Sequence, residues 1–169
     1  PWLKLKKLPK PTIAQVQGVC IAGGLVLVAM CDLIVASEDA RFQNPACLVG
    51  AVGAELPIEA WEIGVRKAKE LLFTGDVMLA EEAGRLGLVN RVVPREDLVE
   101  ETLTLARRVA SSAPWAVQSV KNVLNRTQDM MGQASALEYG FWIHQISHRT
   151  AEAQAMGEDV AKQFKEHQD

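Results

Sequence analysis

The stretch Gln17–Ala36 constrains the fold of this 169-residue chain more than any other part of it. A strand rich in β-branched residues, expected over Thr12–Gln17, runs into a glycine-containing turn. The pair Gly23-Gly24 then opens an almost wholly apolar helix, expected over Leu25–Cys31, and a second apolar strand follows over Leu33–Ser37. Consecutive apolar elements of both kinds predict a buried α/β core.

The glycine pair also has a chemical meaning. The first turn of a helix presents backbone N–H groups without intrahelical partners, at the positive end of the helix dipole. Glycine has no Cβ to block the approach of another group, so such a turn can hold an oxyanion. The alternative is that the two glycines only allow the helix to pack closely on its strand. The pair alone leaves both interpretations open.

Composition narrows the class of protein. The 49% of hydrophobic residues in this length can build one sizeable core. The 18 basic and 21 acidic residues nearly balance, so no nucleic-acid or membrane partner is expected. The longest apolar run, Val19–Cys31, is too short to span a bilayer. Cys20, Cys31 and Cys47 lack disulfide or metal-ligand spacing, which predicts reduced core cysteines in a cytoplasmic protein.

Beyond the opening unit the chain becomes increasingly helical. A short strand is expected over Ala40–Phe42 and a loop rich in glycine and proline over Asn44–Leu56. A further strand is predicted over Leu88–Val93, and helices over Ile58–Gly64, Arg66–Phe73, Ala80–Leu86, Arg95–Ala110, Trp115–Thr127 and Gln133–Met156. Ser112 is expected to cap the helix that begins near Pro114. This order predicts an α/β core over residues 1–111 and a helical region over residues 112–169.

Several motifs stand in one order along nearly the whole chain: Lys10-Pro11-Thr12-Ile13-Ala14, Gly18-Val19-Cys20-Ile21-Ala22-Gly23-Gly24-Leu25, Met30-Cys31-Asp32-Leu33-Ile34-Val35-Ala36, Ala40-Arg41-Phe42, Gly50, Lys69-Glu70-Leu71-Leu72-Phe73-Thr74-Gly75 and Ala83-Gly84-Arg85-Leu86-Gly87-Leu88-Val89-Asn90-Arg91-Val92-Val93-Pro94. Together they resemble the signature of the crotonase superfamily, which contains the enoyl-CoA hydratases and isomerases.

The resemblance implies a crotonase-like fold, with an incomplete ββα spiral core followed by a helical trimerisation region. It also implies that a substantial N-terminal segment of the family, with the first strands and one oxyanion-hole N–H, is absent from these residues. The chain is therefore expected to be a fragment or to have lost its N-terminal part. The implied assembly is a homotrimer or a dimer of trimers.

Family members bind an acyl-CoA thioester and polarise its carbonyl with two backbone N–H groups. The motif places one donor at Gly23, flanked by Ala22 and Gly24. The resemblance also implies that Trp142 lies in the region that lines the acyl pocket and that Lys165 reaches a CoA phosphate. No metal and no cofactor are expected, because the coenzyme A belongs to the substrate.

The hydratase branch of the family uses two glutamates, and this chain has neither. Val26 and Ala46 stand at the corresponding positions, and neither side chain can accept a proton. Glu55, in the loop after Gly50 and Gly53, is the candidate substitute, because some branches of the family place a catalytic acid in about this loop. The alternative for Glu55 is a solvated glutamate near the start of a helix.

The sequence therefore predicts an acyl-CoA-binding enzyme, of the lyase or isomerase class, that acts through thioester enolate stabilisation. The rival hypothesis is a non-catalytic acyl-CoA-binding or structural protein of the same superfamily. Other polar residues are weaker candidates for a functional site. His144 and His148 have the spacing of two metal ligands, but no motif supplies a third ligand. Asp32 is interpreted as a structural hydrogen-bonding residue. Glu59 and Glu62 are expected on a helix surface.

Overall fold

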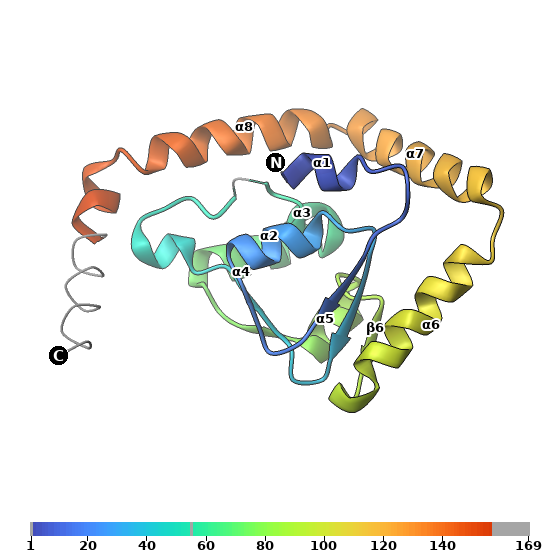
Figure 1. Ribbon diagram of the computed structural model, residues 1–169. Coiled ribbons are helices and arrows are strands. Elements are labelled where there is room, and N and C mark those ends of the chain that lie inside the picture. The colour runs from blue at the N-terminus through green and yellow to red at the C-terminus, as the bar shows by residue number, and fades with distance from the viewer. Residues whose placement is uncertain (1, 55, 157–169) are drawn as a thin grey trace.

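The computed structural model describes residues 2–54 and 56–156 and has the expected mixed α/β architecture (Figure 1). Its strands are β1 (Ile13–Val16), β2 (Val19–Ile21), β3 (Leu33–Ser37), β4 (Arg41–Gln43), β5 (Met78–Leu79) and β6 (Arg91–Val93). Its α-helices are α1 (Trp2–Lys6), α2 (Gly23–Ala29), α3 (Glu59–Glu62), α4 (Val65–Thr74), α5 (Ala80–Leu86), α6 (Leu98–Ala110), α7 (Pro114–Met130) and α8 (Gln133–Ser147). Two 3₁₀ turns, η1 (Ala46–Val49) and η2 (Arg95–Asp97), and a helical segment over residues 151–156 complete the described elements.

The strands form two small sheets. The first has the order β1-β3-β6 and is parallel throughout, with Ile13 opposite Leu33 and Val35 opposite Arg91. The second has the order β2-β4-β5, in which β2 and β4 are parallel and β5 is antiparallel. The first four strands of the chain thus alternate between the two sheets, and α2 carries the chain from the second sheet back to the first.

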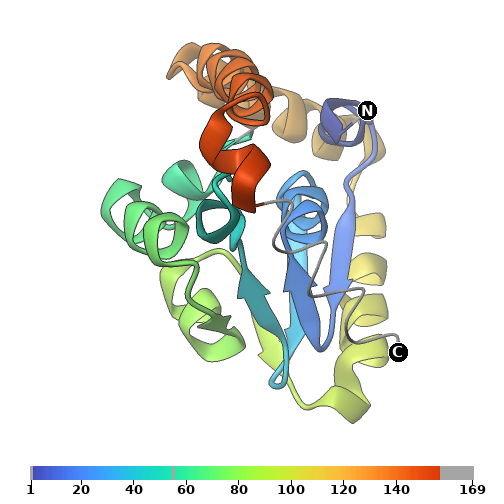
Figure 2. The ribbon, with the colours of Figure 1, turned by 90° about the vertical axis from the view of Figure 1, so that its left-hand side faces the viewer.

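One hydrophobic cluster joins both sheets. Val16, Ile34 and Ala36 enter it from the first sheet, and Cys20 and Phe42 enter it from the second. Helix α6 packs against β1 and β3. In Figure 2, α6 (yellow-green) lies on one side of these strands and the green helices α4 and α5 lie on the other. The sheets are therefore covered on both sides, as parallel strands require.

The last helices form an arm over one end of the core. In Figure 1, α6 lies along the right-hand side of the core, and α7 and α8 then run across the top of the view, above α1 and α2. Leu137 of α8 completes a second apolar cluster with Val26, Met30, Leu56 and Ile58. This cluster attaches α8 to α2.

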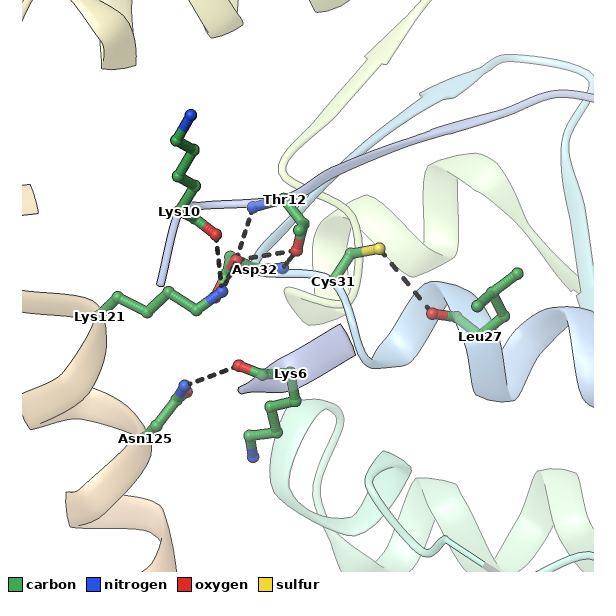
Figure 3. Close-up of polar contacts among 8 residues, drawn as sticks. All are labelled: Lys6, Lys10, Thr12, Leu27, Cys31, Asp32, Lys121 and Asn125. Carbon is green, nitrogen blue, oxygen red and sulfur yellow. Dashed lines mark hydrogen bonds and ion pairs between the residues drawn. The ribbon is translucent and has the colours of Figure 1, made fainter. Parts of the chain in front are cut away.

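Asp32 fastens the arm to the core (Figure 3). Its Oδ2 accepts hydrogen bonds from the Thr12 N–H at 2.7 Å and the Thr12 hydroxyl at 2.9 Å. The same oxygen is 2.7 Å from the Lys121 ammonium on α7, which also donates to the Lys10 carbonyl at 3.1 Å. The structural role predicted for Asp32 is confirmed.

Most element predictions are confirmed, and their errors have local causes. The elements β3 and α5 have the expected bounds, and α4 ends at Gly75, which adopts φ 67°. The strands β2 and β5 were missed because three and two residues are too few to show a period. The expected cap at Ser112 is wrong: Ala113 occupies the cap position of α7, with no side-chain hydrogen bond.

Two predictions about burial are also wrong. Glu59 is buried and Glu62 is partly buried, although both were expected on a helix surface. The helix that carries them is only one turn long and packs against α4, so it has little free surface. Cys20 is a core residue, and its burial raises the pKa of the thiol to about 11. Cys31 is partly buried, and the prediction of a core cysteine is wrong for Cys47, which is exposed on the short 3₁₀ turn η1.

Within residues 2–54 and 56–156, no helix combines the length and the apolarity that crossing a bilayer requires.

Replacing Lys121 by Met should destabilise the protein by about 2 kcal/mol, because it leaves the largely buried Asp32 carboxylate without its cation. Urea unfolding of the whole protein measures the change. Arg126→Met, on the exposed side of the same helix, is the matched control and should change stability by less than about 0.5 kcal/mol. Equal midpoints for the two variants would show that the Asp32 junction contributes nothing.

Candidate active site

The start of α2 is held by the second sheet. Ala22, which follows β2, donates its N–H to the Gln43 carbonyl at the end of β4, at 2.9 Å. Ala22 has φ 47° and ψ −112°, and it is the one non-glycine residue with positive φ in the part of the chain that the structure describes. A non-glycine residue in this region is strained, and such strain concentrates at functional sites. The strained turn directs the chain into α2.

Gly23 is the first residue of α2, and it is exposed together with Gly24. Within the described residues, no acceptor is recorded for the Gly23 N–H, as expected for the first turn of a helix. A Cβ built on Gly23 meets no heavy atom within 4 Å, and one on Gly24 lies 3.8 Å from the Cys20 sulfur. Close packing therefore does not require glycine at position 23, and the space on the Cβ side of this residue is open.

Val26 and Ala46 are the two positions predicted from the sequence to stand in place of the hydratase glutamates. Val26 is 3% exposed and belongs to the apolar cluster that joins α2 to Leu137. Ala46 begins η1, where its N–H lies 3.4 Å from the Asn44 Oδ1. The groups at both positions are apolar methyls, so neither can transfer a proton.

The loop over residues 50–54 packs directly on this region. The Asn44 amide donates to the Gly53 carbonyl at 2.7 Å, and both residues are buried. A Cβ on Gly53 would lie 2.7 Å from Asn44 Oδ1 and 3.0 Å from Ala46 Cβ, so only glycine fits. The loop backbone therefore forms a wall beside the side chain of Ala46.

Of the remaining site residues predicted from sequence, the structure describes Trp142 alone. Glu55 and Lys165 lie outside the described residues. Trp142 lies on α8 with 59% of its surface exposed, and its ring meets that of Phe141 edge-on at 5.9 Å. The structure thus brings together Ala22, Gly23 and Gly24 at the start of α2 and leaves Trp142 on an open surface.

Two histidines contribute a contact that the sequence did not predict. His144 Nδ1 lies 2.6 Å from the Val52 carbonyl oxygen, and His144 Nε2 lies 3.0 Å from His148 Nε2. Among the described residues, no group of three side chains could hold a metal ion. The only signal in the sequence was the spacing of four residues, which puts both rings on one face of a helix.

A cavity of about 680 Å³ lies at the opposite end of α2, between Met30–Ile34 and α7. Glu62 and Lys6 line it, and burial raises the pKa of the Glu62 carboxyl and lowers the pKa of the Lys6 ammonium. The seven residues from Gly23 to Ala29 span roughly 9 Å of helix between their first and last Cα atoms, so this cavity is separate from the Gly23 N–H.

The sequence and the fold have close relatives. The profile of the enoyl-CoA hydratase/isomerase family matches residues 1–169. The chain is 44% identical to the "Putative enoyl-CoA hydratase EchA13" of Mycobacterium tuberculosis over 148 residues, which are 87% of this chain and 46% of that protein. The chain thus spans about half the length of the curated relatives it matches.

Comparison with solved structures indicates the same family as the sequence matches. A crystal structure of a probable enoyl-CoA hydratase from Mycobacterium smegmatis matches 86% of this chain and 59% of its own, with TM-score 0.84 and 49% identity. An enoyl-CoA hydratase from the same organism matches 95% of this chain and 55% of its own, with TM-score 0.89 and 27% identity. The series of motifs along the chain, the two small sheets and these matches agree: the chain belongs to the enoyl-CoA hydratase/isomerase family.

Proposed function

We propose that the whole protein binds an acyl-CoA thioester and stabilises the enolate that forms from it. The observation that carries this proposal is the exposed start of α2, where Gly23 contributes a first-turn N–H and a Cβ built on it would meet no neighbouring atom. A donor in that position holds the negative charge that develops on a thioester oxygen, and one such donor is worth about 3 kcal/mol. The choice of an acyl-CoA thioester as the ligand is supported by family membership, because relatives of this chain are named as enoyl-CoA hydratases.

The acid–base chemistry differs from that of the hydratase branch. A general acid or base contributes about 10²- to 10⁴-fold in rate, and Val26 and Ala46 provide none. We therefore propose Glu55 as the acid–base residue. Support comes from its neighbours in sequence, since Gly53 and Ala54 lie in the wall that packs on Ala46.

The substrate defines the other requirements. The reaction needs no metal and no cofactor besides the coenzyme A of the substrate. Ala22 and Gly24 flank the thioester, while Trp142 and Lys165 contact the acyl chain and a CoA phosphate. Free thiols at Cys20, Cys31 and Cys47 support a cytoplasmic location.

A second candidate is a non-catalytic member of the family that binds acyl-CoA or supports an assembly. The specific observation in its favour is Val26, which is fully committed to the apolar cluster beneath α8. A family member that had lost the two catalytic glutamates would still need an apolar residue such as Val26 at this position to keep its fold.

We also propose that the region 112–169 forms the interface of a homotrimer or a dimer of trimers. Helices α7 and α8 expose large apolar side chains: Trp115, Val120, Val123, Leu124, Met130, Met131, Tyr139, Phe141, Trp142 and Ile146. Trp115 and Met130 are 81% and 78% exposed. Apolar surface on this scale marks an interaction site in a folded protein.

The enzymatic proposal predicts slow hydration of crotonyl-CoA by the whole protein, below roughly 10² per second, and faster turnover of another ester within a panel of enoyl-CoA thioesters. On the ester that is turned over, Glu55→Gln should reduce the rate by about 10²-fold or more and leave acyl-CoA affinity nearly unchanged. Glu38→Gln, an exposed carboxylate on the turn after β3, is the matched control. A Glu55→Gln variant with the parent rate would refute the assignment, and binding without turnover of any ester would favour the scaffold.

The oligomer proposal predicts a trimer or hexamer by light scattering of the whole protein at micromolar concentration. Trp115→Lys combined with Met130→Lys should shift the mass towards the monomer, because two charges are buried without partners. Lys4→Glu, on the exposed first turn of α1, is the control and should not alter the mass. A stable monomer in the parent protein would contradict the proposal.

A further inference from the structure

The side of α8 that packs on the core carries mostly small and polar residues, which is unusual for a packed helix. The residues that face the core are Gln133, Leu137, Gly140, His144 and Ser147, spaced by four and three positions. Leu137 is the large apolar member of this set, and it contacts the cluster of Val26. The polar members nearer the C-terminus lie over the loop of residues 50–54. Here α8 attaches to the core by hydrogen bonds.

Both backbone polar groups of Val52 are held by α8. The Val52 N–H donates to the Ser147 hydroxyl at 3.1 Å, and the Val52 carbonyl lies 2.6 Å from His144 Nδ1. The Ser147 hydroxyl donates its own hydrogen to the His144 carbonyl at 2.7 Å, so its lone pairs remain available to Val52. Two side chains one helical turn apart thus satisfy one loop residue completely.

The proton arrangement of the histidines follows from the acceptors. A carbonyl oxygen can only accept, so His144 Nδ1 carries a hydrogen. In the neutral ring Nε2 is then an acceptor, and His148 Nε2, at 3.0 Å, donates to it. His148 therefore stabilises the tautomer of His144 that holds Val52.

The same loop contacts the candidate site on its other side. Gly53, next to Val52, accepts the Asn44 amide hydrogen bond and leaves no room for a Cβ beside Ala46. The helical segment over residues 151–156 packs against the first residue of the loop, since a Cβ on Gly50 would lie 3.0 Å from Ala153 Cα. A shift of Val52 would therefore move the wall at Ala46.

We infer that His144 and Ser147 are positioning residues, which fix the loop over residues 50–54 against Asn44–Ala46 and so set the shape of the acyl-CoA site. The contribution to catalysis rests on the function proposed above. The attachment of the loop does not, because it follows from the hydrogen bonds of Val52 alone. The two parts can be tested separately in one set of variants.

The variants are made in the whole protein. His144→Phe keeps a ring and removes the donor, while His144→Asn keeps an N–H close to the position of Nδ1. Ser147→Ala removes the acceptor of the Val52 N–H, and Gly53→Ala displaces the loop from the opposite side. Gln145→Ala, on the exposed side of α8, is the matched control.

The first readout is amide hydrogen exchange, by mass spectrometry, of peptides that contain Val52. His144→Phe and Ser147→Ala should each accelerate exchange there about tenfold, whereas His144→Asn and Gln145→Ala should stay close to the parent. If His144→Phe accelerates exchange throughout the protein, the milder Ser147→Ala decides the outcome. Unchanged exchange at Val52 in Ser147→Ala would overturn the attachment.

The second readout is turnover of the accepted acyl-CoA ester. His144→Phe, Ser147→Ala and Gly53→Ala should lower kcat about tenfold and change KM by less than about threefold, with kcat restored in His144→Asn. Faster exchange at Val52 with parent kcat would overturn the positioning role and leave only a structural one. If no ester is turned over by the parent, the proposed function fails, and the exchange data still decide whether α8 holds the loop.

Discussion

The carboxylate of Asp32 is the contact on which the arrangement of the other parts depends. It lies where α2 ends and β3 begins, and through Thr12 it fixes the start of the neighbouring strand β1. Through Lys121 it also fixes α7, 89 residues further along the chain. A charge that is 80% buried needs partners of this kind, since its desolvation would otherwise cost several kcal/mol. One residue therefore sets the position of the helical arm relative to the core.

Helix α8 follows α7 and contacts the surroundings of both Val26 and Ala46, the two positions predicted to lack the hydratase glutamates. Leu137 packs on Val26, and His144 and Ser147 hold the loop that lies against Ala46. In this chain the two places are therefore occupied by packing and by backbone hydrogen bonds. Gly23, at the start of α2, stays exposed.

The sequence predicts the core well because its signals are local. Apolar runs predicted β3 and α5 with their observed bounds and α2 and α4 to within two residues, and the series of motifs from Lys10 to Pro94 predicted the family. The helix α8 shows where such reasoning fails. Its outward side carries Tyr139 and Trp142, while its inward side carries Gln133, Gly140 and Ser147, so hydrophobicity alone assigns the faces in reverse. The contact between His144 and Val52 joins residues 92 positions apart, which no local period can predict.

The central claim is that the Gly23 N–H polarises a thioester carbonyl, and the carbonyl itself reports this most directly. Isotope-edited infrared spectroscopy of an acyl-CoA labelled at the thioester carbon, bound to the whole protein, measures the strength of that bond. The account predicts a C=O stretch at lower frequency than in an apolar solvent, because hydrogen bonds weaken the double bond. In Gly23→Val, which has room for its side chain but blocks the approach of the thioester, the frequency should return towards the unbound value. A bound thioester whose frequency is the same in the parent and in Gly23→Val would contradict the account.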